Sequence, residues 1–180
     1  MKEEQLQAIA NIIQVSYTGF GIRTGFGDKP VFNYHYSVPG SDLSGTYSKG
    51  IGHAVKIVNG SSKDLKKRLP GSRPLDGMDK KIAGESGFKR VPLTIAEYQG
   101  IEYYPPITTG LEILSSLVSD ALCVDDSTFE DFCVSLGYDT ESRKALDTYL
   151  TCQRTLEGLR KLDIYSIGEA FEILEEMEAL

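Results

Sequence analysis

The period of the hydrophobic pattern changes along the chain, and this change constrains the fold more strongly than any other feature. Residues 3–13 repeat apolar side chains at helical spacing, which predicts a short amphipathic helix. Residues 12–38 then alternate apolar with polar side chains, and residues 46–58 follow after a Pro-Gly turn, which predicts strands. The strand at 31–38 should be half-buried. One of its faces should carry Phe32, Tyr34, Tyr36 and Val38, and the opposite face Asn33, His35 and Ser37.

From residue 105 to the end of the chain the period is helical. The side chains expected to cap these helices are Thr109, Ser127 or Thr128, Asp139 or Thr140, and Ser166, with Glu112 and Glu169 completing two capping boxes. Gly137 should end the short helix that begins near residue 128. The longer helix that follows carries a stripe suited to packing along another helix: Ala145, Tyr149, Cys152, Leu156 and Leu159. We predict an α+β fold, a small antiparallel sheet from the N-terminal half packed with a C-terminal bundle of three to four helices.

Charge is distributed unevenly along the chain, although the net charge is only −7. Residues 1–48 hold three Lys/Arg and four Asp/Glu, residues 49–90 hold eleven and four, and residues 91–180 hold five and eighteen. A length of 180 residues predicts a single domain, with a helix and strands in 1–58, a basic mobile loop in 59–90 and an acidic helical half in 91–180. The basic segment should attract phosphate, while the acidic part should repel nucleic acid and attract basic proteins.

The sequence offers little material for catalysis or metal binding. His35 and His53 are the only histidines, and neither lies near a cysteine or near the other, so a zinc site is not expected. The carboxylates Asp120, Asp125, Asp126, Glu130 and Asp131 lack the calcium-loop pattern, and helix capping accounts for those near a helix start. We therefore expect a non-enzymatic protein without metal or cofactor. An enzyme would return as a hypothesis if His53 and a carboxylate proved to line one pocket.

Other classes of protein are excluded on similar grounds. No apolar run approaches the ~20 residues that cross a bilayer, and the acidic N-terminus does not resemble a signal peptide. The repeated TGFG at 18–21 and 24–27 lacks the spacing of a phosphate loop and indicates a bend between strands. Cys123, Cys133 and Cys152 form no CxxC pair, which favours buried, reduced thiols in the cytosol.

Residues 127–149 have the coarse form of a helix-turn-helix. A helix that reads DNA must present basic and amide side chains, and the second helix offers Arg143 and Lys144. Acidic residues flank these two, and the surrounding half of the chain is strongly negative, so we interpret the corner as packing rather than DNA recognition.

The same stretch carries a family resemblance. The string TFEDFCVSLGYDTESRKALDTY, preceded by PPITTGLEILSSLVSDA, is similar to a widespread family of small phage and prophage proteins. The aromatic strand YHYSVPG and the short KGIGH, Lys49 to His53, would occupy the place of an upstream motif of that family. The resemblance covers mainly residues 105–155 and more loosely 30–58. The segments 59–90 and 163–180 depart from it.

The resemblance implies a phage accessory protein acting in the cytoplasm of the host bacterium. Some phage proteins of this size and acidity are anti-CRISPR inhibitors, so the leading hypothesis is a protein that binds a Cas9-type effector with its guide RNA and blocks DNA binding or cleavage. The residues expected to contact guide RNA or DNA are Lys63, Lys66, Lys67, Arg68, Arg73, Lys80, Lys81, Lys89 and Arg90. Those expected to contact a basic protein surface are Glu169, Glu172, Glu175, Glu176 and Glu178.

Two other hypotheses remain open at this point. The first is a phage nucleic-acid-binding accessory protein that acts through the basic loop 59–90, with Tyr34, Tyr36 and Tyr47 as stacking surfaces. The second is an assembly protein that self-associates through the apolar stripe at 145–159.

Overall fold

The computed structural model describes residues 1–23, 29–50, 55–58, 96–98 and 101–179. It divides the chain into two compact units. Unit 1 comprises Met1–Gln14, Tyr36–Gly45 and Thr109–Leu180, and unit 2 comprises Val15–His35 and Thr46–Thr108. The segments of unit 1 lie far apart in the sequence, so its core depends on contacts between the two ends of the chain.

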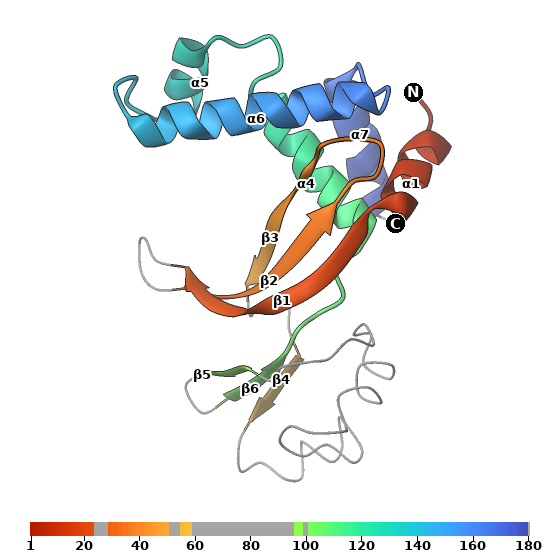
Figure 1. Cartoon of the computed structure of the whole chain (residues 1–180), viewed down its shortest axis with the longest axis vertical. Helices are drawn as coiled ribbons and strands as arrows, with labels where there is room; N and C mark the ends of the chain where they lie inside the picture. Colours follow the sequence, from red (N-terminus) through yellow and green to blue (C-terminus); the bar gives the residue numbers. More distant parts are fainter. Residues whose placement is uncertain (24–28, 51–54, 59–95, 99–100, 180) are drawn as a thin grey trace. The chain divides into compact units, whose positions relative to one another are not determined.

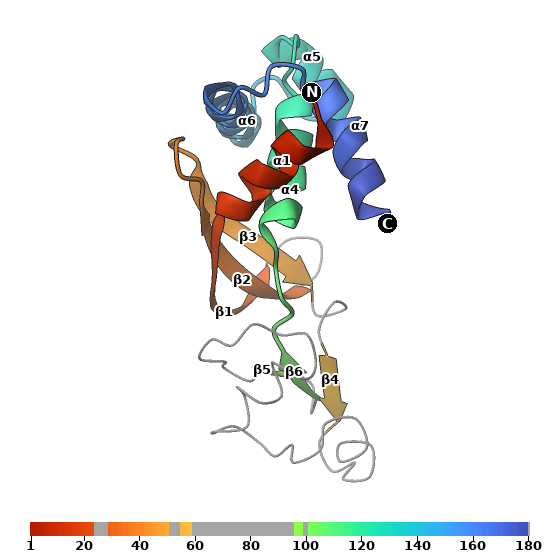
Figure 2. The ribbon, with the colours of Figure 1, turned by 90° about the vertical axis from the view of Figure 1, so that its right-hand side faces the viewer.

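Unit 1 is helical. Its helices are α1 (Glu3–Ile12), α4 (Gly110–Leu122), α5 (Phe129–Leu136), α6 (Arg143–Lys161) and α7 (Ile167–Glu178) (Figure 1). α4 packs against α1, α6 and α7, and it lies among them in the view of Figure 2. The stripe predicted on α6 is buried, as are apolar residues of every other helix; the most deeply buried large side chains are Leu6, Ile113, Leu114, Val118, Phe132, Leu159, Ile164, Ile167 and Leu174.

The helix ends partly follow the predicted caps. Thr109 and Thr128 begin α4 and α5, each accepting a hydrogen bond from a backbone N–H three residues on, and Gly137 ends α5 with a φ of 71°. The predicted cap of α6 is wrong, because Ser142, not Asp139 or Thr140, begins that helix. The Asp139 carboxylate instead accepts the N–H of Glu141 at 3.0 Å, an Asx turn that delays the helix.

The capping box predicted at the start of α7 is also wrong. Ser166 is the N-cap residue of α7, but its side chain makes no capping hydrogen bond. The carboxylate of Glu169 accepts a hydrogen bond from the Met1 ammonium at 2.9 Å. The Met1 ammonium carries a full positive charge, whereas the backbone N–H of a capping box is a neutral donor, so the carboxylate favours the ammonium.

Two glycines of unit 1 allow close approaches that define its packing. A Cβ on Gly110, the first residue of α4, would lie 1.9 Å from the carbonyl oxygen of Ala10. A Cβ on Gly158, in α6, would lie 2.4 Å from Cγ of Leu43. Near this contact, Lys161 Nζ of α6 donates to Asp42 Oδ2 of the β2–β3 turn at 2.7 Å, an exposed ion pair.

Strands make up the described elements of unit 2. One sheet has the order β1 (Gln14–Arg23), β2 (Lys29–Ser37), β3 (Ser44–Gly50), and the turn between β2 and β3 belongs to unit 1. The other has the order β4 (Val55–Val58), β6 (Ile101–Tyr104), β5 (Ala96–Tyr98), with both pairs antiparallel. The predicted strand at 46–58 is therefore two strands, one in each sheet.

The alternation predicted for β2 is confirmed only in part, because Tyr36 is half-buried like Asn33 and Ser37. Phe32 and Tyr34 are buried, whereas His35 is exposed, and the ring of Tyr17 packs against both buried rings. The hydroxyl of Tyr34 donates to the carbonyl oxygen of Pro106, and Lys49 Nζ donates to that of Ile107 at 3.1 Å. These bonds hold the segment before α4 against the sheet within unit 2.

The protein thus has an α+β fold, as predicted, with an antiparallel sheet from the N-terminal half and a C-terminal group of helices. Among the described residues no helix combines the length and apolar character needed to cross a membrane.

Candidate functional site

The division into units separates the charges about as sharply as the sequence segments do. Unit 1 holds six Lys/Arg and nineteen Asp/Glu, whereas unit 2 holds thirteen and seven. Unit 1 therefore carries a net charge of −13, and unit 2 one of +6. Opposite charge on two compact units gives each a different preference for partners.

α7 concentrates much of the negative charge of unit 1. All five carboxylates predicted to contact a basic partner lie on this helix, and all are exposed: Glu169, Glu172, Glu175, Glu176 and Glu178. Glu169 pairs with the Met1 ammonium. The other four form no ion pair within the described part of the chain, so their charge is available to a partner.

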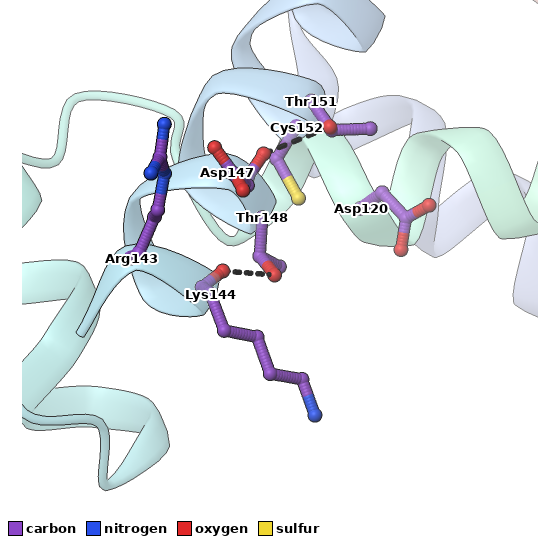
Figure 3. A pocket seen from close by; sticks show the side chains of 7 residues that line it. All are labelled: Asp120, Arg143, Lys144, Asp147, Thr148, Thr151 and Cys152. Atoms are coloured by element: carbon purple, nitrogen blue, oxygen red, sulfur yellow. Dashed lines mark hydrogen bonds between the residues drawn. The ribbon is translucent and has the colours of Figure 1, made fainter. Parts of the chain in front are cut away.

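A hollow of about 530 Å³, the α4–α6 hollow, lies between the C-terminal half of α4 and the N-terminal half of α6. Its lining residues are Asp120, Arg143, Lys144, Asp147, Thr148, Thr151 and Cys152. Figure 3 shows Asp120 facing it from α4, with Arg143 and Lys144 directed apart on α6. The hydroxyls of Thr148 and Thr151 donate to the carbonyl oxygens of Lys144 and Asp147, each at 2.8 Å, which leaves them as acceptors toward a ligand.

The electrostatics of the α4–α6 hollow do not favour nucleophilic chemistry. Burial, and then the charges of Asp120 and Cys123, raises the pKa of the Cys152 thiol to about 11. The thiol is therefore protonated near neutral pH, and the thiolate is the nucleophilic form. Partial burial also raises the pKa of Asp120, and burial followed by the charge of Asp120 raises that of Tyr36. Among the seven lining residues there is no histidine to serve as a base.

The carboxylates at 120–131 are separated by the fold. Asp120 faces the hollow, Asp125 lies 3.9 Å from the Arg160 guanidinium, and Asp131 accepts the N–H of Thr128 in the capping box of α5. Across the described residues no three His, Cys, Asp or Glu side chains are arranged to hold a metal ion.

The helix-turn-helix corner is occupied by aromatic packing. The Tyr149 ring lies 5.4 Å from that of Phe129 and 5.3 Å from that of Phe132, and its hydroxyl donates to Ser127 O at 3.0 Å. The hypothesis of self-association through the α6 stripe is wrong, because that stripe is buried against the other helices of unit 1.

Not all residues predicted to contact a partner are among the described ones. The nine basic residues from Lys63 to Arg90, and His53, lie outside the described residues. Tyr34 is buried and bonded, so it is not available as a stacking surface, whereas Tyr36 and Tyr47 are half-buried. Of the thiols, Cys133 and Cys152 are buried as expected, but Cys123 is exposed; all three are free.

Comparison with known proteins adds no family to this description. None of the family models matches the chain, and no curated protein or solved structure is significantly similar to it.

The sequence singled out Arg143, Lys144 and Asp120 for other roles and missed the hollow they share. The apolar stripe on α6 could have indicated that its neighbours at 147, 148 and 151 face the space beside α4.

Proposed function

We propose that the chain is a non-enzymatic, phage-encoded inhibitor of a bacterial defence system. Its partner is a Cas9-type effector with its guide RNA, and it blocks DNA binding or cleavage in the host cytoplasm. The observation that supports this best is the set of four exposed carboxylates on α7 that have no ion partner among the described residues, within a unit of net charge −13. The channel of such an effector is positively charged because it holds nucleic acid, and a row of carboxylates supplies the matching charge.

Binding of a basic protein by the carboxylates of α7 requires no chemical reaction. Carboxylates on a folded helix are held in place before binding, so little additional order is lost when they meet lysines and arginines. Complementary charge also speeds the encounter of the two proteins. The phage origin of the proposal comes from the resemblance at 105–155.

The test is capture of an assembled Cas9–guide RNA complex, together with cleavage of target DNA. We expect the wild-type chain to bind the complex and inhibit cleavage. Changing Glu172, Glu175, Glu176 and Glu178 to Gln should weaken binding at least about fourfold, because four charge pairs contribute roughly 0.2–1 kcal/mol each. The matched control changes Glu3, Glu4, Glu130 and Glu141 to Gln, which alters the net charge equally at exposed sites on other parts of unit 1.

Two results would contradict the proposal: no capture by the wild-type chain, or an equal loss in both quadruple variants. The alternative function is a phage nucleic-acid-binding accessory protein acting through residues 59–90, which the charge of +6 on unit 2 favours. It predicts salt-sensitive retention of DNA or RNA without any protein, and loss of that retention when Lys66, Lys67, Arg68, Lys80 and Lys81 are changed to Ala.

A further inference from the structure

The side of α6 that faces away from its buried stripe forms a continuous surface, the α6 outer face. Its side chains stand at i, i+3, i+4, i+7, i+11 and i+14, which places them within about a third of the helix circumference. In Figure 2, which looks along α6, the helix lies at the edge of unit 1 with α4 to one side of it. The members of the α6 outer face, all exposed, are Arg143, Leu146, Asp147, Leu150, Arg154 and Glu157.

Two leucines lie in the middle of the α6 outer face. Leu146 and Leu150 are 42% and 38% exposed, and their spacing of four residues makes them neighbours on the helix surface. An exposed leucine by itself indicates nothing, because folded proteins expose many apolar atoms. An apolar centre with charges on both sides is, however, the pattern with which one helix packs along another. The charges therefore decide what can cover these leucines.

The charges of the α6 outer face are arranged symmetrically about Leu150, with opposite sign on its two sides. Arg143 lies seven residues before Leu150, and Glu157 lies seven residues after it. Asp147 lies three residues before Leu150, and Arg154 lies four residues after it. A second α6 that runs in the opposite direction across Leu150 therefore places a carboxylate opposite each cation. A surface with this property is complementary to itself, as a twofold interface requires.

The charged side chains of the α6 outer face are available for such a contact. Arg143 and Asp147 stand at i, i+4, and Arg154 and Glu157 at i, i+3, so each pair could have formed an ion pair along the helix. Neither does, and none of the four forms an ion pair with any other described residue. Their charges can therefore pair with those of another molecule.

We propose that the α6 outer face binds the same face of a second copy of this chain, with the two α6 helices antiparallel across a twofold axis near Leu150. At the axis, Leu150 packs against the partner's Leu150. Leu146 is covered by the methylene groups of the partner's Arg154, as long basic side chains cover apolar surface. This face is opposite the buried stripe from Ala145 to Leu159, so the contact leaves the core of unit 1 unchanged.

Ion pairs surround the leucines in this dimer. Arg143 pairs with the partner's Glu157, and Asp147 pairs with the partner's Arg154, and each contact occurs twice because of the twofold axis. A contact along about four turns of one helix is smaller than the ~1,200–2,000 Å² of a stable protein interface, so the dimer is weak and reversible. The charged pairs therefore determine which surface is recognised more than they determine affinity.

The experiment is sedimentation equilibrium of the full chain over protein concentrations of about 10 μM to 1 mM. A salt concentration of about 0.15 M screens the repulsion between distant charges of two acidic chains but leaves close ion pairs in place. We expect the average mass to rise from monomer to dimer. Asp147→Arg and Arg154→Asp each place like charges opposite one another, so each should weaken association at least about tenfold.

An equimolar mixture of the variants Asp147→Arg and Arg154→Asp is the decisive sample. In a dimer with one copy of each variant, every altered side chain lies opposite a residue of opposite charge. The mixture should therefore associate about as strongly as the wild-type chain, although neither variant associates alone. A mixture that stays monomeric would overturn the proposal, and so would a wild-type chain that is monomeric at every concentration.

A matched pair of apolar substitutions tests the centre of the contact. Leu150→Gln should weaken association at least about tenfold, because it places a polar side chain on the twofold axis. Val134→Gln is the control, since Val134 is 82% exposed on α5 and lies outside the α6 outer face, and it should leave association unchanged. Equal weakening by both substitutions would overturn the proposal. The experiment contains neither effector nor nucleic acid, so its result does not depend on the proposed function.

Discussion

The contact between Gly158 and Leu43 allows a quantitative test of the packing of unit 1. Gly158 is buried in α6, and a Cβ there would lie 2.4, 2.6 and 2.8 Å from Cγ, Cδ2 and Cδ1 of Leu43. Leu43 is itself 9% exposed, so its side chain has little room to move. Gly158→Ala gains about 1 kcal/mol of helix propensity but overpacks a buried site, which costs about 1–3 kcal/mol. Because three atoms lie within 3 Å, we expect the upper part of that range and a net loss of about 1–2 kcal/mol.

The assay is equilibrium unfolding in urea, followed by the helical circular dichroism signal. A lower midpoint at unchanged slope would report the loss of stability. Gly168→Ala is the control, because Gly168 is exposed on α7 and its added Cβ would meet no atom within 4 Å. That variant should gain about 0.5–1 kcal/mol from helix propensity alone.

A double-mutant cycle tests whether the contact itself is responsible. Leu43→Ala should cost about 2–5 kcal/mol as a buried truncation. With that side chain removed, Gly158→Ala no longer meets a branched residue, so the double variant should cost at least about 1 kcal/mol less than the two single changes together. The reasoning is refuted if Gly158→Ala matches the wild-type stability, or if the two changes add within about 0.5 kcal/mol.

Two further changes test other features of unit 1. Gly110→Ala places its Cβ 1.9 Å from the Ala10 carbonyl oxygen, a backbone atom that cannot rotate away. We therefore expect a larger loss of stability than at Gly158, about 3 kcal/mol or more in the same urea assay. Wild-type stability would contradict the close packing of α1 on α4. The raised pKa of Cys152, about 11 against an ordinary 9.0, means that the unfolded thiol ionises first as the pH rises. Its contribution to stability is therefore complete below pH 9 and is lost between pH 9 and 11, and a parallel decline in Cys152→Ala over that window would show that other groups cause the loss.

The helices of unit 1 could be predicted because each carries a clear apolar period. The α6 stripe from Ala145 to Leu159 is buried along its whole length, as its spacing required. Cap residues were less predictable, because more than one side chain near a helix start can bond to the backbone. Asp139 and Ser142 are both suitable caps, but Asp139 accepts the N–H of Glu141 and Ser142 accepts that of Ala145, so Ser142 takes the role.

The candidate sites were harder to predict than the elements. Glu169 was expected to close a capping box, but its partner is the Met1 ammonium, 168 residues away in the sequence. The α4–α6 hollow is formed by two helices that are not consecutive in the sequence, and the apolar period of one helix does not show which other helix lies beside it. The strands β5 and β6 were missed for a simpler reason, since three and four residues are too few to show an alternation.

The placement of acidic residues on α7 favours a binding role over mere solubility. α1 and α5 carry their acidic residues in the first turn and α6 carries Arg160 and Lys161 in its last turn, in agreement with the helix dipole, although α6 also begins with Arg143 and Lys144 and α4 has Asp120 near its C-terminus. α7 carries one carboxylate in its first turn and gathers Glu175, Glu176 and Glu178 toward its C-terminus, against the dipole. Solubility requires only that charges be exposed, and it would be served equally well at the other end of the helix. An arrangement that weakens the helix alone, and that a basic side chain would stabilise, is expected where a cation binds.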